Sequence, residues 1–500
     1  MRRFRVLRTF LALACFGAVG LSISPSSAFD AQVSAETTAQ GYQLRNAWGD
    51  PVLSRRRFMQ TLGLNVTNIG EGDSDVGVPS DDEPHVSFRM RLRFDSDFAV
   101  QASEVDYKDS PSVYVAGLER SPLDLMYGYV DVQNLASGML HMRLGRQYVI
   151  DPLGWWSFDG AHMRVELPIF MAFEGYGGFE QRAGLPLSLG RFEPDGVWRG
   201  DRDSLDANAY PGFLEAGVAP ALGVVAETYA LPVVHGRVAY RKVWNSGRVA
   251  TNPFSNIRTG LPDTTEGYRT SQERVGASAD ALVQGLGSVR VGLVYDLPRA
   301  RFSSWYGSID AFLMQDATVG VDVDRNVPTF DGDSIWSWFS SGATSTALGR
   351  VDVGLTQNLR VAAAGGVRWV ELDISAESTG TPSLDLDVLG RASAHYQGRE
   401  GKVGVSGMVD RGERGEREGV DILGDYWFER RFLVLGRVSL FDWHDEYRPE
   451  RSATSLGYVL GGGYRIGDVT QARVEWEHDT NELVGQRYRI LASLQLLVTP

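Results

Sequence analysis

The sequence predicts an all-β protein, a transmembrane antiparallel up-and-down β-barrel of about 18–22 strands, an even number, and three observations support this fold. Apolar and polar residues alternate with a period of two along most of the chain, as in HVSFRMRLRF at 85–94. Short and long connections between these stretches largely alternate along the chain. Beyond residue 28, no apolar run reaches the roughly 20 residues that a membrane-spanning helix needs. A chain without such a helix crosses a membrane as a closed barrel.

The N-terminus predicts export. Residues 1–28 combine Arg2, Arg3, Arg5 and Arg8 with the apolar stretch LALACFGAVGLSI and a small-residue site, SSA, so we interpret them as a cleavable signal peptide. Cleavage removes four arginines and no acidic residue, which makes the exported chain more acidic than the formal net charge of −14 for the whole sequence. It also removes the single cysteine, which excludes a disulfide framework. The acidic balance argues against binding to nucleic acid.

The remainder divides into two expected parts. We expect residues 29–57 to form a periplasmic N-terminal segment and residues 58–500 to form an outer-membrane β-barrel, with strands from 58–69 to 487–498. Only about 30 exported residues precede the first expected strand, so no plug domain is expected there.

Connection lengths predict the orientation. Short turns are expected at DSD, residues 95–97, and near residues 355–358, 429–431 and 467–469. Long connections are expected at 108–121, 149–160, 181–214, 245–271, 325–346 and 411–418. In outer-membrane barrels the short turns face the periplasm and the long loops lie outside. A wide barrel without a plug leaves an aqueous channel, which we expect 181–214 and 245–271 to narrow.

Charged residues on the face opposite the apolar one are candidates for the channel lining. Arg89, Arg91 and Arg93 alternate with apolar residues, so one face suits lipid and the other a water-filled lumen. The expected pore-lining residues are Arg89, Arg91, Arg93, His141, Arg143, Gln147, Arg164, Glu166, Asp385, Asp387, Arg391, Arg473 and Glu475. Opposed cationic and acidic walls would sort solutes by charge. The alternative is that these groups neutralise one another across a filled lumen.

One segment resembles a known family. Residues 138–165, GMLHMRLGRQYVIDPLGWWSFDGAHMRV, resemble the strand-loop-strand of porin-like barrels of the alginate-export type. The matching residues are Gly145, Arg146, Gln147, Trp155, Trp156, Phe158, Asp159 and Gly160. The resemblance implies a pore of roughly 18 strands that passes anionic polysaccharide along lumenal arginines and lysines.

Metal sites and cofactors are not expected. DVDRNVPTFDGD places Asp322, Asp324, Asn326 and Asp333 at the spacing of a calcium loop, but Val327 stands where the sharp turn requires glycine. We interpret this stretch as an acidic external loop.

Enzymatic activity is not expected either. His444-Asp445 and His478-Asp479 are similar to the His/Asp dyads of outer-membrane hydrolases, but no serine or aspartate constellation completes a site. Both pairs fall at expected strand ends, where polar pairs are common.

Three functions are compatible with these observations. The first is a porin-like channel in the bacterial outer membrane for passive diffusion of small polar or anionic solutes, including oligosaccharides. The alternative is a structural or conduit barrel for a secretion or polysaccharide-export partner, and the third is an outer-membrane hydrolase. The expected partners are the lipid bilayer and lipopolysaccharide, the solute, and the barrel-assembly machinery.

Overall fold

The structure is a computed structural model. It describes residues 29–46, 48–69, 84–97, 123–181, 219–229, 231–246, 249–252, 263–265, 267–327, 342–371, 384–412, 415–445, 450, 452–467, 469–482 and 485–498. Residues 1–28, the expected signal peptide, lie outside this set.

The described residues form 24 strands. They are β1 (Asp30–Arg45), β2 (Pro51–Thr67), β3 (His85–Asp97), β4 (Leu123–Leu135), β5 (Leu140–Asp151), β6 (Gly154–Leu167), β7 (Met171–Glu180), β8 (Pro220–Thr228), β9 (Val234–Asn245), β10 (Val249–Asn252), β11 (Asp263–Thr265), β12 (Arg269–Val283), β13 (Gly287–Asp296), β14 (Arg301–Met314), β15 (Ala317–Asn326), β16 (Thr344–Gly354), β17 (Leu359–Glu371), β18 (Leu384–Gln397), β19 (Gly401–Gly412), β20 (Gly415–Phe428), β21 (Phe432–Asp445), β22 (Ala453–Ile466), β23 (Thr470–Asn481) and β24 (Gly485–Val498).

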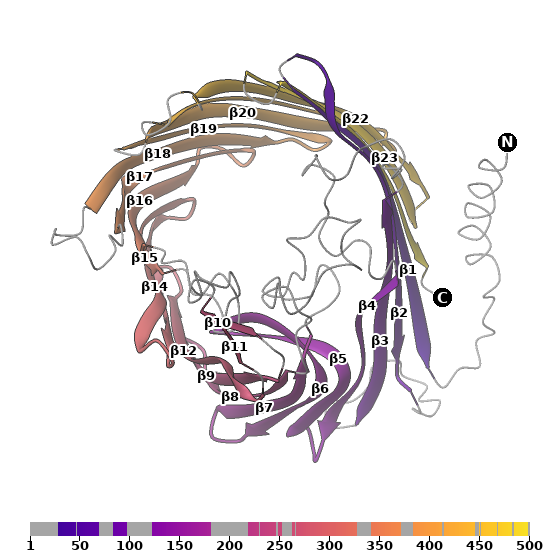
Figure 1. Ribbon diagram of the computed structural model, residues 1–500, viewed down its shortest axis with the longest axis vertical. Helices are drawn as coiled ribbons and strands as arrows, with labels where there is room; N and C mark the ends of the chain where they lie inside the picture. The colour runs from indigo at the N-terminus through magenta and orange to yellow at the C-terminus, as the bar shows by residue number, and fades with distance from the viewer. Residues whose placement is uncertain are drawn as a thin grey trace.

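Twenty-two of the described strands form one closed antiparallel barrel (Figure 1). Successive strands pair with one another, and β1 pairs with β24 from Val33 opposite Val498 to Arg45 opposite Gln486, which closes the ring. β10 and β11 form a separate two-stranded sheet between β9 and β12, which pair directly. The expected fold class is confirmed, and the strand number falls at the top of the expected range.

The expected start of the barrel is wrong. Residues 29–57 are not a separate segment, because β1 occupies Asp30–Arg45 and β2 begins at Pro51. The outward face of β1 carries Ala35, Thr37 and Ala39, which give only a weak apolar alternation. Pairing along both neighbouring strands stabilises β1 despite this weak local signal.

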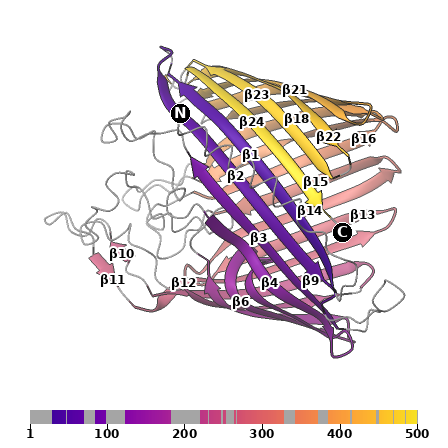
Figure 2. The ribbon, with the colours of Figure 1, turned by 90° about the vertical axis from the view of Figure 1, so that its right-hand side faces the viewer.

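The two ends of the barrel differ in their connections (Figure 2). The turn end, where both β1 starts and β24 ends, has short connections at 136–139, 168–170, 229–233, 284–286, 315–316, 355–358, 398–400, 429–431 and 467–469, and one long one at 68–84. The loop end has the long connections at 98–122, 181–219, 246–268, 327–343 and 372–383, with shorter ones between them. The expected segregation of long connections is therefore largely confirmed.

Three expected connections are wrong. Residues 95–97 are not a tight turn but the last residues of β3, at the loop end. Residues 149–160 are not a long loop, because β5 and β6 are joined by Pro152 and Leu153 alone. Residues 411–418 likewise belong mostly to β19 and β20.

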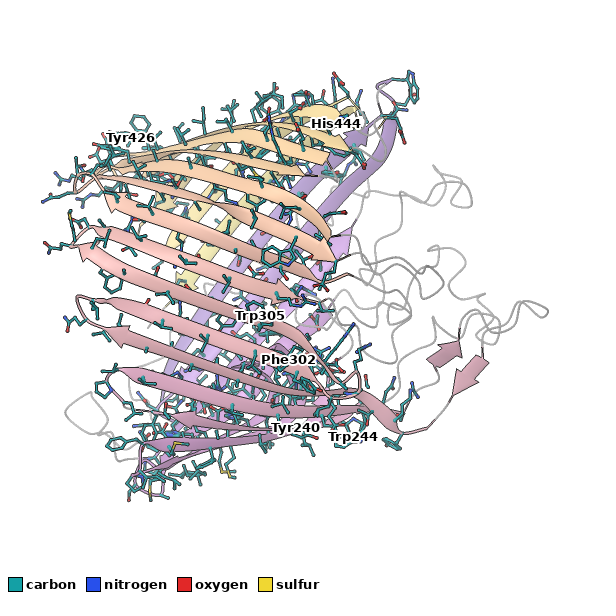
Figure 3. The ribbon with its side chains drawn as sticks, turned by 90° about the vertical axis from the view of Figure 1, so that its left-hand side faces the viewer. Tyr240, Trp244, Phe302, Trp305, Tyr426 and His444 are labelled. Atoms are coloured by element: carbon teal, nitrogen blue, oxygen red, sulfur yellow. The ribbon has the colours of Figure 1, made fainter. Side chains whose placement is uncertain are left out.

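The outer surface is apolar and has aromatic rims. Figure 3 shows Trp305 and Trp244 on the outside toward the loop end and Tyr426 at the turn end. Residues directly opposite in register share a face, so Trp305 places Leu293 outside as well. Exposed outward apolar side chains include Leu293, Ile309, Val321, Val388, Leu460 and Ile490. Within the described residues, no helix is long and apolar enough to span a membrane.

Among the described residues, no second layer covers the inner face of β17–β24, and many of its charges are paired between neighbouring strands. We call these strands the single-layer sector. Arg368 on β17 contacts Asp387 at 2.6 Å and Asp410 at 2.8 Å. Glu477 on β23 contacts Arg487 at 2.6 Å and also contacts Arg489. Pairing offsets much of the cost of removing these charges from bulk water.

Candidate functional site

A row of glycines crosses β5, β6 and β7. Gly145 lies opposite Gly160, which lies opposite Gly178. Gly145 has φ of 130°, in a region that favours glycine. A Cβ at Gly160 would clash with the carbonyl oxygen of Gly177 on the neighbouring strand. We call this row the glycine crease, because the close backbone approach there accompanies a sharp bend of β5 and β6.

Beyond the crease, β5 and β6 fold into the barrel. Figure 1 shows them arching across the inner side of β7, β8 and β9. We call residues 146–159 the inner hairpin. Its tip reaches β9, where Arg237 donates a 2.6 Å hydrogen bond to the Ile150 carbonyl and Arg241 donates one of 3.3 Å to that of Leu153.

The tip also reaches β12. The Leu153 Cδ2 atom lies 2.7 Å from where a Cβ on Gly276 would stand, so a side chain at this position would push the Leu153 methyl group aside. Gly276 is opposite Ala239 of β9, whose side chain is buried. The inner hairpin therefore forms a second layer inside the barrel wall.

A small apolar core lies between the inner hairpin and the wall. Trp156 and Phe158 are 1% and 0% exposed, and their rings stack with centroids 4.7 Å apart. The cluster comprises Val149, Trp156, Phe158, Tyr176, Ala219, Ala221, Val225, Ala239 and Val243, with Leu153 packed against it. Burying these side chains stabilises the folded-in position by the hydrophobic effect.

Polar contacts hold the same position. The Tyr176 hydroxyl donates a 2.8 Å hydrogen bond to Asp151, and the Arg241 guanidinium lies 3.9 Å from the same carboxylate. The Trp156 indole N–H donates to Glu180 at 2.9 Å. The Arg241 guanidinium also lies over the Trp156 ring, 5.3 Å from its centroid.

The other side of the inner hairpin lies next to β4, the strand that pairs with β5 as far as Gly128 opposite Arg146. Arg146 and Asp159 form a two-pronged ion pair at 2.7 and 2.9 Å, and Arg146 also donates to the Leu125 carbonyl of β4 at 2.9 Å. Tyr148 contacts Tyr127 of β4, which lies opposite Arg91 on the inner face. Side chains that would point outward in a straight β5 therefore point into the barrel interior.

The three arginines of β3 all lie on the inner face, with different partners. Arg93 is buried and pairs with Asp124 at 3.3 Å. Arg91 pairs with Glu36 at 3.3 Å. Arg89 is exposed and makes no ion pair with a described residue.

The expected pore-lining residues of β5 and β6 differ in position on the two sides of the glycine crease. Arg143 lies 3.6 Å from Asp131. Arg164 pairs with Glu166 at 2.8 Å and also with Glu174 and Glu227, and the His141 ring accepts a hydrogen bond from the Asn134 N–H. The expected pore position of Gln147 is wrong: it is 1% exposed, and its amide donates to the Gly160 carbonyl inside the hairpin.

The expected residues of the later strands also lie on the inner face. Asp385 and Asp387 are buried, and Asp387 pairs with Arg368, whereas Arg391 is exposed. Arg473 pairs with Glu475 on its own strand. Many of the expected residues thus pair with opposite charges nearby instead of forming separate cationic and acidic walls.

Sequence reasoning missed several residues of this site. Asp124, Asp151, Arg237 and Arg241 were not singled out at all, and Arg146 and Asp159 were named for the resemblance but not as lining residues. With a two-residue turn at 152–153, register counting places Arg146 opposite Asp159, so the correct turn length would have found this pair. The contacts of Arg237 and Arg241 depend on the fold of the hairpin and have no local signal.

The two histidine–aspartate pairs form no dyads in the described residues. Consecutive strand residues point to opposite faces, so His444 and His478 lie outside and Asp445 and Asp479 inside. The His478 ring stacks on Tyr488 with centroids 4.4 Å apart. Ser452 Oγ lies 2.6 Å from His444 Nδ1 and accepts a hydrogen bond from the Asp445 N–H.

The acidic-loop interpretation of residues 322–333 is wrong in its first part. Asp322 and Asp324 lie on β15, and Asp322 pairs with Arg350 at 2.6 Å. Asp333 lies outside the described residues. Among the residues that the structure describes, no group of three or more side chains could hold a metal ion.

Comparison with known proteins finds structural similarity alone. An Acinetobacter baumannii protein, OccAB4, is similar over 95% of this chain and 99% of its own, with 6% identity and a TM-score of 0.42. The outer membrane protein opdK of Pseudomonas aeruginosa, with 10% identity, covers 94% and 99% at 0.39, and a BenF-like porin from Pseudomonas fluorescens Pf-5, with 7% identity, covers the same shares at 0.41. No family model and no curated protein matches, so the alginate-export resemblance stays a prediction.

Proposed function

We propose that this protein is a bacterial outer-membrane channel for passive diffusion of small polar or anionic solutes. The observation that carries the proposal is a closed barrel with an apolar outer band, aromatic rims and a charged inner face, narrowed by the inner hairpin. Such an outer surface suits a lipid bilayer, and a charged inner surface suits water and solute.

The inner hairpin supports a selective channel over a wide unselective one. It places Arg146 and Asp159 toward β4, beside Arg93 and Asp124. A narrow passage lined by both signs of charge acts on solutes through short-range contacts more than through a long-range field. The narrowing by the inner hairpin favours small polar or charged solutes over polysaccharide chains.

Conductance tests the proposal. Purified full-length protein in a planar bilayer should give discrete ohmic steps, with the step size reflecting the narrowed passage. Silence at every voltage would contradict channel function and support the alternative of a barrel that surrounds or anchors a secretion or polysaccharide-export partner.

Orientation is tested on intact cells. We propose that the loop end faces outward and the turn end the periplasm, because long connections gather at the loop end. A cysteine placed within 327–343 should react with an impermeant reagent, and one at Thr356 should not. Residues 95–97 lie at the loop end and cannot serve as the periplasmic control.

A further inference from the structure

A pocket of about 500 Å³ lies at the turn end, far along the wall from the inner hairpin. Arg399 and Arg430 line it from the turns 398–400 and 429–431, and Lys402, Trp427 and Arg465 from β19, β20 and β22. The last three lie on the inner face by register. The pocket therefore opens to the mouth of the channel.

Cations outnumber acids in this pocket. Its four cationic residues, Arg399, Lys402, Arg430 and Arg465, face the acids Glu400 and Asp425. Asp425 pairs with Lys402 at 3.2 Å.

Glu400 is engaged as well, because the Tyr426 hydroxyl donates to it at 2.6 Å. Arg399, Arg430 and Arg465 make no ion pair with any described residue. Three guanidinium groups without an anionic partner among the residues that the structure describes are thus gathered around one pocket.

The pocket is held in shape before any ligand arrives. The Arg465 guanidinium lies over Trp427, 4.7 Å from the ring centroid, which limits its rotation. The Trp427 N–H donates to the Glu400 carbonyl at 2.7 Å, and the Arg465 N–H donates to the Arg431 carbonyl at 2.9 Å. These backbone bonds tie the two turns to the strands that carry the other cations.

We propose that this pocket binds small organic and inorganic oxyanions, through carboxylate or phosphate groups, at the turn-end mouth. Guanidinium groups match both oxyanions with paired hydrogen bonds, and the indole offers an apolar surface for the rest of an organic ligand. This proposal rests on the proposed channel function. It adds the class of solute, oxyanions, and a second place, besides the inner hairpin, where the solute contacts the protein.

Titration calorimetry of the full-length protein in detergent tests the site. The probes are inorganic phosphate and benzoate, which separate the two oxyanion sources, and glucose is the neutral control. The triple variant Arg399→Gln, Arg430→Gln, Arg465→Gln should bind the preferred oxyanion at least about tenfold more weakly, because charge-assisted hydrogen bonds are lost. Arg431→Gln is the matched control: it changes a turn arginine that does not line the pocket and should leave binding unchanged.

The outcomes separate this proposal from the channel proposal. Wild-type protein that conducts but binds neither oxyanion, or binds equally in the triple variant, overturns the pocket and leaves the channel standing. Specific binding with no conductance overturns the channel and leaves the pocket as a binding site alone. Trp427→Phe checks that the indole matters, since it should weaken benzoate binding more than phosphate binding.

Discussion

The wall around β5–β9 and the single-layer sector of β17–β24 belong to the same ring, yet different side chains cover their inner faces. In the single-layer sector, pairs such as Arg368 with Asp387 cover the inner face with charge. Around β5–β9, the inner hairpin covers it with a second layer, and Trp156 and Phe158 become core residues. The difference shows that the alternation of residues determines which side chains face inward. The glycine crease, by letting the inner hairpin fold inward, determines whether those side chains face the barrel interior or are buried in a core.

The largest expected effect comes from emptying the core beneath the inner hairpin. Trp156→Ala should lower the free energy of unfolding by about 3–5 kcal/mol, because a large buried ring is lost. It should also raise the conductance step as the hairpin loosens. Denaturant unfolding in liposomes and single-channel recording measure the two effects.

The matched control is Trp443→Ala, which removes a partly exposed tryptophan from the inner face of the single-layer sector. It should cost clearly less stability and leave the conductance step near wild type. Equal costs for the two variants would show that the two sectors are packed alike.

A smaller effect is expected at the glycine crease. Gly160→Ala adds a Cβ that collides with the Gly177 carbonyl, so the strands must move apart at a cost of roughly 1–3 kcal/mol. The cost is measured by thermal unfolding, with Gly390→Ala as control. A Cβ at Gly390 meets nothing within 4 Å, and the comparison fails if the two substitutions are equally tolerated.

The same contrast between buried and exposed side chains exists on one strand, β3, between Arg93 and Arg89. Arg89→Gln should lower the anion-to-cation permeability ratio, most at low salt, because Arg89 is exposed and screening acts over about 8 Å at physiological ionic strength. Arg93→Gln should chiefly destabilise the protein, since it leaves Asp124 unpaired. Reversal potentials in asymmetric salt measure the ratio, and an unchanged ratio in Arg89→Gln would exclude this arginine from solute selection.

The smallest expected effect on conductance comes from a disulfide that fixes the inner hairpin to the barrel wall. Cysteines replacing Pro152 and Gly276 should form a disulfide once the Leu153 methyl group rotates away, since the Pro152 Cβ lies 3.2 Å from an ideal Cβ at Gly276, slightly closer than the roughly 3.8 Å typical of such bonds. Conductance should barely change, because the bond fixes a position already occupied. Cysteines replacing Pro152 and Arg391, which lies on the inner face of β18, should not cross-link, and cross-linking in that pair alone would place the hairpin elsewhere.

The fold could be predicted from the sequence largely because alternation is local. The period alone places the arginines of β3 and the acids of β18 on the inner face. β1 could not be predicted in this way, because its outward face carries small residues and threonine and therefore shows only a weak apolar alternation. The inner hairpin could not be predicted from alternation either. Its bend depends on glycines of three strands that lie side by side, and no single stretch of sequence shows this arrangement.

The seam of the ring, where β1 meets β24, is a strand pair like the others, with Val33 opposite Val498. The first and last strands therefore leave the wall at the same end and next to each other. A circularly permuted chain, joined from residue 498 to residue 30 and opened in the turn 284–286, would keep every strand pair of the barrel. Synthesis would then deliver the single-layer sector to the membrane before the inner hairpin, and the order in which the two layers assemble would be reversed.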